Sequence, residues 1–306
     1  MRFSDSEIQS TGAFLVGELE KLDPELYQPI ADFTWSRDID LRTDVTIADE
    51  VSSFILNTFA GGFSGTGVGK KSWISGKDST PAQVGVSATK VSNPITPWGM
   101  EVSYSVFELQ KAMAVGRPID VQKYDAMRMK HNLDIDQMVY LGDTEIGVTG
   151  LLNNPAVSTG NIGAFVDGTT TPAQIIAMFN AVIEAAWSAT QYARMPNRIL
   201  VPPTLFKALI GTQLPNTDKN LLNFVLENNL SRANGVFLEI YPCKYLAGVD
   251  KIVAYTKSRD CVRFPLVQLQ SLPVQFRDYM QIVPYYGALG AVEFVRPEMV
   301  YYGILA

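Results

Sequence analysis

The feature that most constrains this sequence is a long stretch without helical periodicity, residues 61–97, within an otherwise regularly patterned chain. Loops longer than about 12–15 residues are uncommon in compact domains and usually carry a function. Val84, Val86 and Ala88 alternate with small residues. Together with a facing strand at Trp73–Ile74, this alternation predicts a long β-hairpin. Because a two-stranded ribbon is marginally stable alone in water, we expect it to lie on another copy of the same chain.

Composition and charge argue against several classes of protein. The 306 residues are 47% hydrophobic and 18% charged, which is enough for one large domain or two closely joined ones. A net charge of −6 without a basic stripe argues against a protein built to grip nucleic acid. The sequence shows no membrane span and no signal-peptide pattern, so we expect an intracellular, water-soluble protein. Cys243 and Cys261 lack redox or metal spacing, which favours reduced structural thiols.

Helical patterns are concentrated in the middle of the sequence and strand patterns lie at both ends, which predicts an α+β fold. The expected helices cover residues 14–22, 102–141 in two parts, 172–192, 203–210 and 219–230. Residues 35–45 are expected to be extended, and residues 51–59 to form a strand or a short helix. Strands are expected at residues 198–201 and over most of the chain after residue 237.

Local signals predict where some of these elements begin and end. Gly116-Arg117-Pro118 separates the second helix from the third, which Asp120 is expected to cap. Residues 171–174 (TPAQ) have the form of a capping box with proline at the first helical position. Gly142 is expected to end the long helix in a left-handed conformation.

No residue pattern supports a catalytic, cofactor or metal site, and we predict none. The single histidine, His131, lies between Met127 and Ile135 on a helical stripe, which favours a core position over catalysis or metal binding. Residues 65–71 (GTGVGKK) lack the spacing and the flanking elements of a phosphate-binding loop. Their glycines are better explained as the flexible base of a projecting hairpin.

Two Asp-Ile-Asp triplets are the remaining candidates for chemistry. Asp134 and Asp136 are two residues apart on a helix, so their carboxylates point to different sides and do not share a proton or a metal. Asp38 and Asp40 would lie on one face of a strand, for which a solvated edge is the usual meaning. Neither pair predicts a site.

Several segments occur in the order found in one known family. They are residues 77–81 (KDSTP), 104–112 (YSVFELQKA), 116–120 (GRPID), 141–143 (LGD), 147–155 (GVTGLLNNP) and 290–297 (GAVEFVRP). Taken together, these segments and the long helix resemble the major capsid proteins of tailed double-stranded-DNA phages, which have the Hong Kong 97 fold, and the related encapsulins. The similarity covers most of the chain in the order of its elements.

The resemblance implies a particular division of the chain. Residues 1–45 would form an N-terminal arm, and residues 61–97 an extended loop. Residues 46–60 and 98–155 would form a peripheral domain with a long spine helix, and residues 156–265 an axial domain. Residues 266–306 would supply closing strands shared by the two domains.

The function implied is structural rather than enzymatic. The subunit would assemble as pentamers and hexamers into an icosahedral shell around the phage DNA, in the cytoplasm of a bacterial host. The resemblance also implies a separate scaffolding protein, a portal and possible cement proteins as partners. A mildly acidic subunit suits DNA that is contained without being held by the wall.

The extended loop and the arm are expected to contact neighbouring subunits, because exposed aromatic residues often anchor interfaces. The candidate contact residues are Trp35, Lys70, Lys71, Trp73, Ile74, Lys77, Val84, Val86 and Trp98. The candidate hinge glycines are Gly61, Gly62, Gly65, Gly67 and Gly69. Some members of the family crosslink a loop lysine to a neighbour, but no acceptor can be matched here.

Two alternatives stay open from the sequence. The same fold could form an encapsulin-like compartment that encloses cargo enzymes. The chain could also be a small-molecule enzyme whose residues 61–97 form a mobile lid. The first would be indicated by a cargo protein, and the second by turnover that depends on His131.

Overall fold

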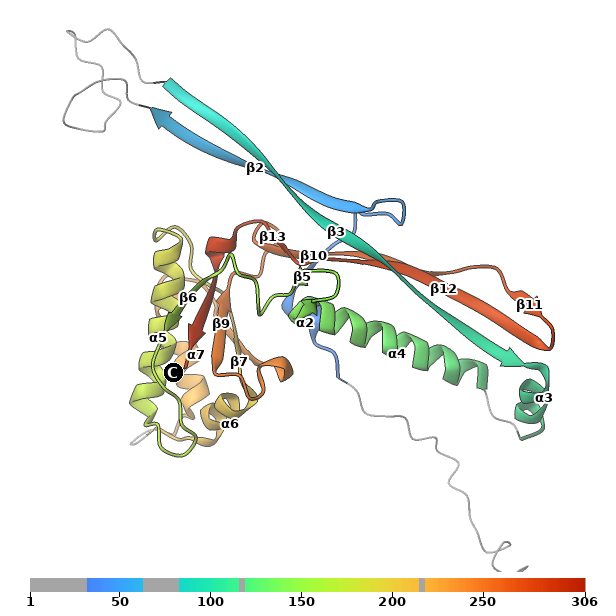
Figure 1. The fold of residues 1–306 in the computed structure, drawn as a ribbon. Coiled ribbons are helices and arrows are strands. Elements are labelled where there is room, and N and C mark those ends of the chain that lie inside the picture. The colour runs from blue at the N-terminus through green and yellow to red at the C-terminus, as the bar shows by residue number, and fades with distance from the viewer. Residues whose placement is uncertain (1–31, 63–82, 116–118, 215–217, 306) are drawn as a thin grey trace, which may run out of the picture. The chain divides into compact units, whose positions relative to one another are not determined.

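The computed structural model describes residues 32–62, 83–115, 119–214 and 218–305 (Figure 1). Its strands form a seven-stranded sheet, a five-stranded sheet and a two-stranded pair, β4 (Gly142–Asp143) with β5 (Val148–Thr149). Helices and strands occur in comparable amounts, so the predicted α+β class is confirmed. None of the described helices has an apolar stretch long enough to span a bilayer.

The seven-stranded sheet carries the long ribbon. Its order is β1-β10-β12-β3-β2, with β11 added to β12 and β13 added to β10. The strands are β1 (Asp40–Arg42), β2 (Val51–Gly62), β3 (Gln83–Ser105), β10 (Val262–Ser271), β11 (Gln275–Arg277), β12 (Met280–Gly290) and β13 (Glu293–Phe294). The β1–β10 pair is parallel and the others are antiparallel.

The 23-residue strand β3 changes its partner halfway along. Its first half pairs with β2, from Gln83 opposite Gly62 to Pro94 opposite Val51. Its second half, from Ile95 to Ser105, pairs with β12. Between residues 51–62 and 83–94 the sheet therefore narrows to a two-stranded ribbon, which Figure 1 shows as β2 and the first half of β3.

The five-stranded sheet is covered by helices. Its order is β6-β14-β9-β7-β8, from β6 (Ser158–Asn161), β7 (Arg198–Val201), β8 (Glu239–Pro242), β9 (Lys251–Tyr255) and β14 (Val300–Ile304). The helices α5 (Pro172–Ala189), α6 (Pro203–Gly211) and α7 (Leu221–Glu227) supply one buried apolar cluster with this sheet, centred on Phe179, Ile199 and Leu205. Two short helices, α8 (Leu230–Ala233) and the 3-10 turn η1 (Lys244–Leu246), complete the connections on this sheet.

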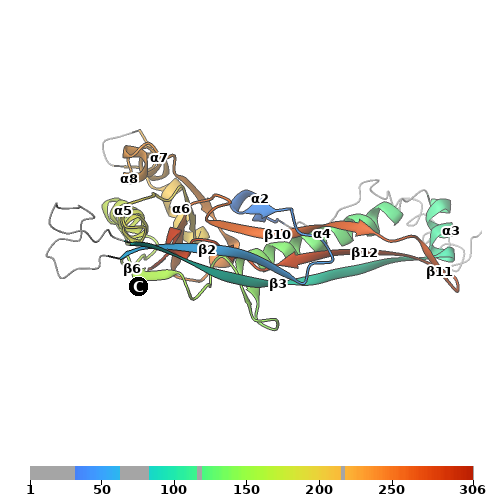
Figure 2. The ribbon, with the colours of Figure 1, turned by 90° about the horizontal axis from the view of Figure 1, so that it is seen from above.

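The helix α4 (Ile119–Tyr140) lies alongside β3 and β12 (Figure 1, Figure 2). Met127 packs there with Val102 and Tyr104 of β3. The C-terminal end of α4 enters the largest buried cluster, where Val139 and Tyr140 meet side chains of both large sheets. The preceding helix α3 (Val106–Val115) and the 3-10 turn η2 (Pro297–Met299) complete the described elements, apart from α2 (Trp35–Asp38).

Most of the predicted local signals are confirmed. Helix α3 ends at Val115 and α4 begins at Ile119, and the break expected at residues 116–118 lies outside the described residues. Thr171 and Gln174 form a reciprocal capping box at the start of α5, and Gly142 has a φ of +71°. Residues 51–59 form a strand, and Asp120 lies inside α4 rather than before it. The helix expected at residues 14–22 lies outside the described residues.

Four predicted elements were wrong in detail. Residues 102–105, expected at the start of the helical region, are the end of strand β3, because they pair with β12. Residues 35–38 form the short helix α2 instead of extended chain, because a distant carboxylate binds its first N–H groups. The helix expected at residues 219–230 is divided into α7 and α8, because Asn229 caps a new helix. The strand at Val84–Ala88 pairs with residues 57–61 of β2, and Trp73–Ile74 lies outside the described residues.

Candidate functional site

One face of the β2–β3 ribbon exposes apolar side chains to solvent. Residues directly opposite each other in an antiparallel pair lie on the same face, and alternate residues of a strand share a face. Val51, Ile55 and Phe59 of β2 therefore share a face with Val86, which is opposite Phe59. These four side chains are 52%, 66%, 73% and 63% exposed, respectively. We call this set the outer face of the ribbon.

The other face of the ribbon lies over a groove. The side chains of Phe54, Leu56 and Val91 are half-buried on this face. They line a groove of about 300 Å³ whose opposite wall includes Val148 and Val292. The inner face is thus partly covered by the chain itself, whereas the outer face contacts nothing among the described residues that buries it.

A second exposed apolar area lies where α3 meets β11 and β12. Phe107, Met113, Phe276 and Tyr279 are each at least 60% exposed. The rings of Phe107 and Tyr279 have centroids 5.9 Å apart, and the N–H of Val106 donates to the carbonyl of Tyr279 at 3.0 Å. Exposed apolar areas of this kind on a folded chain are typical of protein interfaces.

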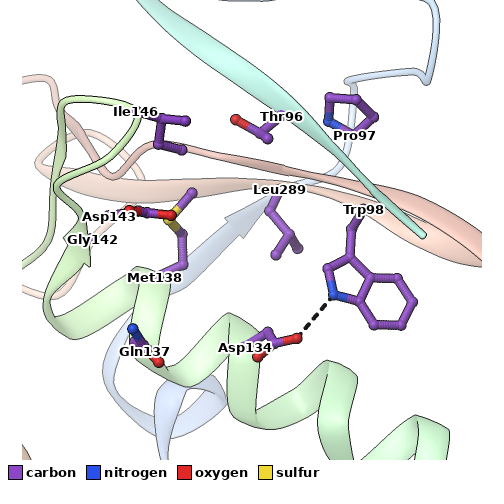
Figure 3. Close-up of a pocket in the computed structure, with 10 residues that line it drawn as sticks. All are labelled: Thr96, Pro97, Trp98, Asp134, Gln137, Met138, Gly142, Asp143, Ile146 and Leu289. Atoms are coloured by element: carbon purple, nitrogen blue, oxygen red, sulfur yellow. Dashed lines mark hydrogen bonds between the residues drawn. The ribbon is translucent and has the colours of Figure 1, made fainter. Parts of the chain in front are cut away.

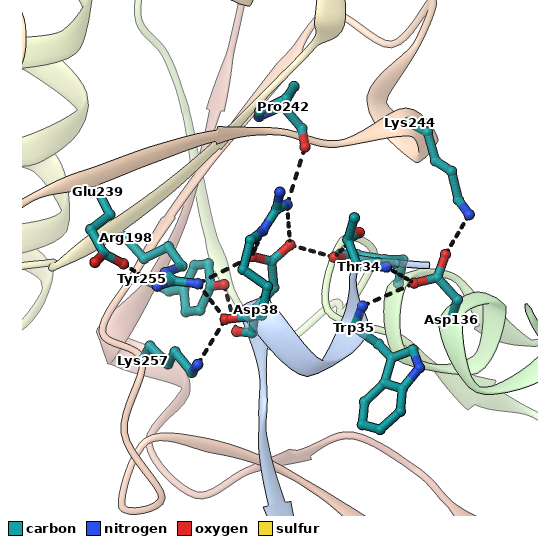
Figure 4. A network of polar contacts seen from close by, with 12 residues as sticks. Thr34, Trp35, Asp38, Asp136, Arg198, Glu239, Pro242, Lys244, Tyr255 and Lys257 are labelled. Carbon is teal, nitrogen blue, oxygen red and sulfur yellow. Dashed lines mark hydrogen bonds and ion pairs between the residues drawn. The ribbon is translucent and has the colours of Figure 1, made fainter. Parts of the chain in front are cut away.

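The short helix α2 is held by a network of buried polar groups (Figure 4). Asp38 is completely buried. Its carboxylate accepts two hydrogen bonds of 2.8 Å from Arg37 and one of 3.2 Å from Arg198. Tyr140 of α4 also donates its hydroxyl proton to this carboxylate. The expectation of a solvated edge at Asp38 was therefore wrong, because side chains from distant parts of the chain surround it.

A carboxylate of α4 fixes the beginning of α2. Asp136, which is completely buried, accepts hydrogen bonds from the N–H groups of Thr34 at 2.9 Å and Trp35 at 3.0 Å. Lys244 forms an ion pair with the same carboxylate at 2.6 Å. These N–H groups are among those that a helix start leaves without intrahelical partners. Asp136 thus stabilises a helix that is too short to be stable on its own.

Two buried tyrosines complete this network. Burial and the negative charge of Asp38 raise the pKa of Tyr140 and of Tyr255 above the usual value for tyrosine. Both phenols therefore stay protonated and act as donors. The hydroxyl of Tyr255 donates to the backbone carbonyl of Asp38 at 2.7 Å. The network thereby links α2 to α4, β7 and β9.

A small pocket beside Trp98 contains Asp134, the first carboxylate of the helical triplet (Figure 3). The pocket has a volume of about 220 Å³. The indole N–H of Trp98 donates to Asp134 at 3.0 Å, while Asp136 points into the α2 network. The two carboxylates thus serve different sides of α4, as predicted. His131 is buried with its ring 4.6 Å from that of Trp98, and this burial lowers the pKa of His131.

The predicted contact and hinge residues differ in their exposure, and only some of them lie in the described part of the chain. Trp35 and Trp98 are half-buried and pack against the main core of their own chain, so exposure does not support them as anchors of an interface. Val86 is exposed on the outer face, and Val84 continues the same strand. Gly61 and Gly62 continue the β2–β3 ladder. The following predicted residues lie outside the described part of the chain: Gly65, Gly67, Gly69, Lys70, Lys71, Trp73, Ile74 and Lys77.

Sequence reasoning did not identify the outer-face residues Ile55 and Phe59. The available signal was the apolar, β-favouring composition of residues 51–59, which predicts a strand or a short helix but does not assign the segment to the ribbon. Within the described residues, no cluster of three or more histidine, cysteine or acidic side chains could hold a metal ion. Cys243 and Cys261 are both free and buried.

Comparison with known proteins addresses the family directly. The profile of the family described as "Major capsid protein" matches residues 69–303. No curated protein matches the chain at a significant level.

Solved structures share the fold over nearly the whole chain. A chain from the capsid of Myoviridae phage XM1 is 17% identical with a TM-score of 0.77, and the match covers 94% of this chain and 97% of that chain. A chain from Mycobacterium phage Bobi is 13% identical with a TM-score of 0.61, and the match covers 99% of both chains. A chain from the virus-like particle of Pyrococcus furiosus is 11% identical with a TM-score of 0.50, covering 88% of this chain and 91% of that chain.

At these identities the structural matches show the fold alone, which is that of phage capsid proteins. The family profile covers most of the chain. The chain therefore belongs to the major capsid protein family, and it is a structural subunit of a phage capsid.

Proposed function

We propose that this subunit assembles as pentamers and hexamers into an icosahedral shell that encloses the double-stranded DNA genome of a tailed phage. The observation that carries the proposal is the outer face of the ribbon. Four large apolar side chains on a two-stranded ribbon are unfavourable in water. They are stabilised if the ribbon lies on a neighbouring subunit, where many modest contacts act together in a closed shell.

The division of the chain that we propose follows from the same fold. Residues 1–45 are the arm, and residues 61–97 are the extended loop. Residues 46–60 and 98–155 are the peripheral domain, and residues 156–265 the axial domain. Residues 266–306 close both domains. The role is structural and without catalysis.

The partners and the location belong to the same proposal. Assembly takes place in the host cytoplasm with a scaffolding protein and a portal, and cement proteins are optional partners of the finished shell. The net charge of −6 favours weak contact with packaged DNA, since strong binding to phosphates requires clustered cations.

A shortened ribbon tests the proposal. Leu56 is opposite Thr89 in the ladder, so residues 57–88 can be replaced by Asn-Gly, which favours a two-residue hairpin turn. We expect the shortened protein to fold but to remain as capsomers or single subunits, whereas the unmodified protein forms closed particles in negative-stain electron micrographs. Closed particles of normal size from the shortened protein would refute the role of the ribbon.

A milder pair of variants separates the apolar face from chain length. The double change Phe59→Ser and Val86→Ser removes two exposed apolar side chains, and we expect it to reduce particle yield strongly. The control Asn57→Ser alters a polar residue on the same face and should leave the yield unchanged. Equal yields from all three proteins would contradict the proposal.

The contents of the particles distinguish a phage shell from an encapsulin-like compartment. The match to the family described as "Major capsid protein" over residues 69–303 favours the phage function. We expect particles from infected cells to protect DNA against nuclease. Particles that contain a single cargo enzyme and no DNA would indicate the compartment instead.

A further inference from the structure

A third buried carboxylate lies where the ribbon leaves the sheet. Glu293 of β13 is completely buried. Arg263 of β10 donates from its Nε to this carboxylate at 2.6 Å, and Arg42 of β1 donates from its Nη1 at 3.1 Å. Ser52, the second residue of β2, donates its hydroxyl proton to the same group. Four strands thus meet at one carboxylate.

The same arginines also hold the next residues of the ribbon. Arg42 donates to the backbone carbonyl of Ser53 at 3.3 Å. The guanidinium group of Arg263 lies over the ring of Phe54, 5.7 Å from its centroid. Buried ion pairs require accurate geometry, because charges removed from water are stabilised only by close partners. The carboxylate therefore restricts the position of residues 52–54 more tightly than apolar contacts would.

The second strand of the ribbon, β3, is also held in place near Ser52 and Glu293. The N–H of Ile95 donates to the carbonyl of Glu50 at 3.0 Å. Ile95 packs in a small buried cluster with Val45 and Val267, and it is the first residue of β3 to pair with β12. Beyond this level, the ribbon lies over the groove of about 300 Å³ rather than on a close-packed surface.

We propose that Glu293, Arg42, Arg263 and Ser52 form a root that sets the direction in which the ribbon leaves the subunit. These are positioning residues for assembly, and the inference rests on the function proposed above. Strands rise about 3.3 Å per residue, so the part of β2 beyond Ser52 is about 30 Å long. A change of about 10° at the root would move its end by about 5 Å, which is more than the reach of a side-chain contact.

The direct test measures the ribbon in unassembled subunits. Nitroxide labels are attached at Val86→Cys on the ribbon and Val166→Cys on the connection before α5, both at exposed positions. The native Cys243 and Cys261 are buried, and burial raises the pKa of both thiols, so they compete poorly for the label. Pulsed electron resonance then gives the distribution of distances between the two labels.

We expect one narrow distribution in the otherwise unmodified protein and a distribution at least twofold wider after Glu293→Gln. This change keeps the shape of the side chain and removes the charge that both arginines bind. The control Lys244→Met breaks the ion pair to Asp136, another buried carboxylate, and should leave the width unchanged. An equally narrow distribution in folded Glu293→Gln protein would overturn the proposal.

Two further outcomes keep the test decisive. If Glu293→Gln does not fold, Ser52→Ala and Arg263→Lys are measured in its place, and unchanged widths in both would overturn the proposal. In assembly, Glu293→Gln is expected to give particles of mixed diameter or open shells, whereas Lys244→Met gives particles of one diameter. If the unmodified protein forms no shells at all, the proposed function fails, but the label measurement still decides the role of the root.

Discussion

Replacing Asp38 by asparagine tests whether the buried network around α2 stabilises the subunit. The carboxylate of Asp38 is completely buried and interacts with Arg37, Arg198 and Tyr140. Asparagine has nearly the same shape but carries no charge and supplies one acceptor oxygen in place of two. The variant therefore leaves Arg198, which is itself buried, without a buried counter-charge.

The loss of unfolding free energy in Asp38→Asn depends on the charged groups that remain around the site. Removing one partner of a buried ion pair costs about 3–5 kcal/mol. Arg37 is about 30% exposed and Arg198 keeps an ion pair with Glu239, so we expect the lower end, about 3 kcal/mol. Since 1 kcal/mol changes Tm by about 2–4 °C in domains of this order of size, Tm should fall by about 6–12 °C.

The assay is thermal and chemical unfolding of unassembled subunits, followed by circular dichroism. The matched control is Glu227→Gln, which removes an ion pair between exposed side chains of Glu227 and Lys219. Exposed pairs contribute about 0–1 kcal/mol, so the Tm of this control should change little. A shift for Asp38→Asn that is no larger than that of the control would refute the reasoning that this network stabilises the fold.

Three further predictions concern backbone conformation, pH and thiol reactivity. Gly147→Ala should lower the free energy of unfolding by about 1–2 kcal/mol, because Gly147 has a left-handed φ of +69°. Gly142→Ala should lower it by about 1–3 kcal/mol more, because an added Cβ would also lie 2.3 Å from a backbone oxygen. Equal losses for the two variants in urea unfolding would contradict this. Burial lowers the pKa of His131 in the folded protein. On acidification the unfolded chain therefore binds a proton at His131 before the folded chain does, and stability is lost as the pH falls below about 6.5. His131→Gln should flatten the pH dependence of the unfolding free energy between pH 7 and 5.5, and an unchanged slope would argue against this role of His131. Burial raises the pKa of Cys243 to about 11 and also raises that of Cys261, so an aromatic disulfide reagent at pH 8 should react with neither thiol until denaturant is added; rapid reaction in the native protein would show that a thiol is accessible.

The parts of the fold that depend on neighbouring residues were predicted correctly. The capping box at Thr171 and the left-handed Gly142 each involve interactions within a few residues. The core position of His131 follows from the 3.6-residue period of its apolar neighbours.

The parts that depend on distant residues were missed. Asp38 looks like an exposed acid beside Asp40, yet its partners Tyr140 and Arg198 are more than 100 positions away in the chain. The strand partner of Val86 is Phe59, across a separation that short-range alternation does not reveal. Long-range pairing depends on which surfaces meet in the folded state, and no local pattern encodes it.

The sequence by itself determined the α+β class, some of the helix ends and a resemblance to phage capsid proteins, because periodicity and capping residues act locally. Tertiary structure decided which carboxylates are buried, where β3 changes its partner and which face of the ribbon is exposed. Asp38, Asp136 and Glu293 are stable as buried charges only because arginine, lysine, hydroxyl and N–H groups from distant segments converge on them. That convergence is a property of the packed chain.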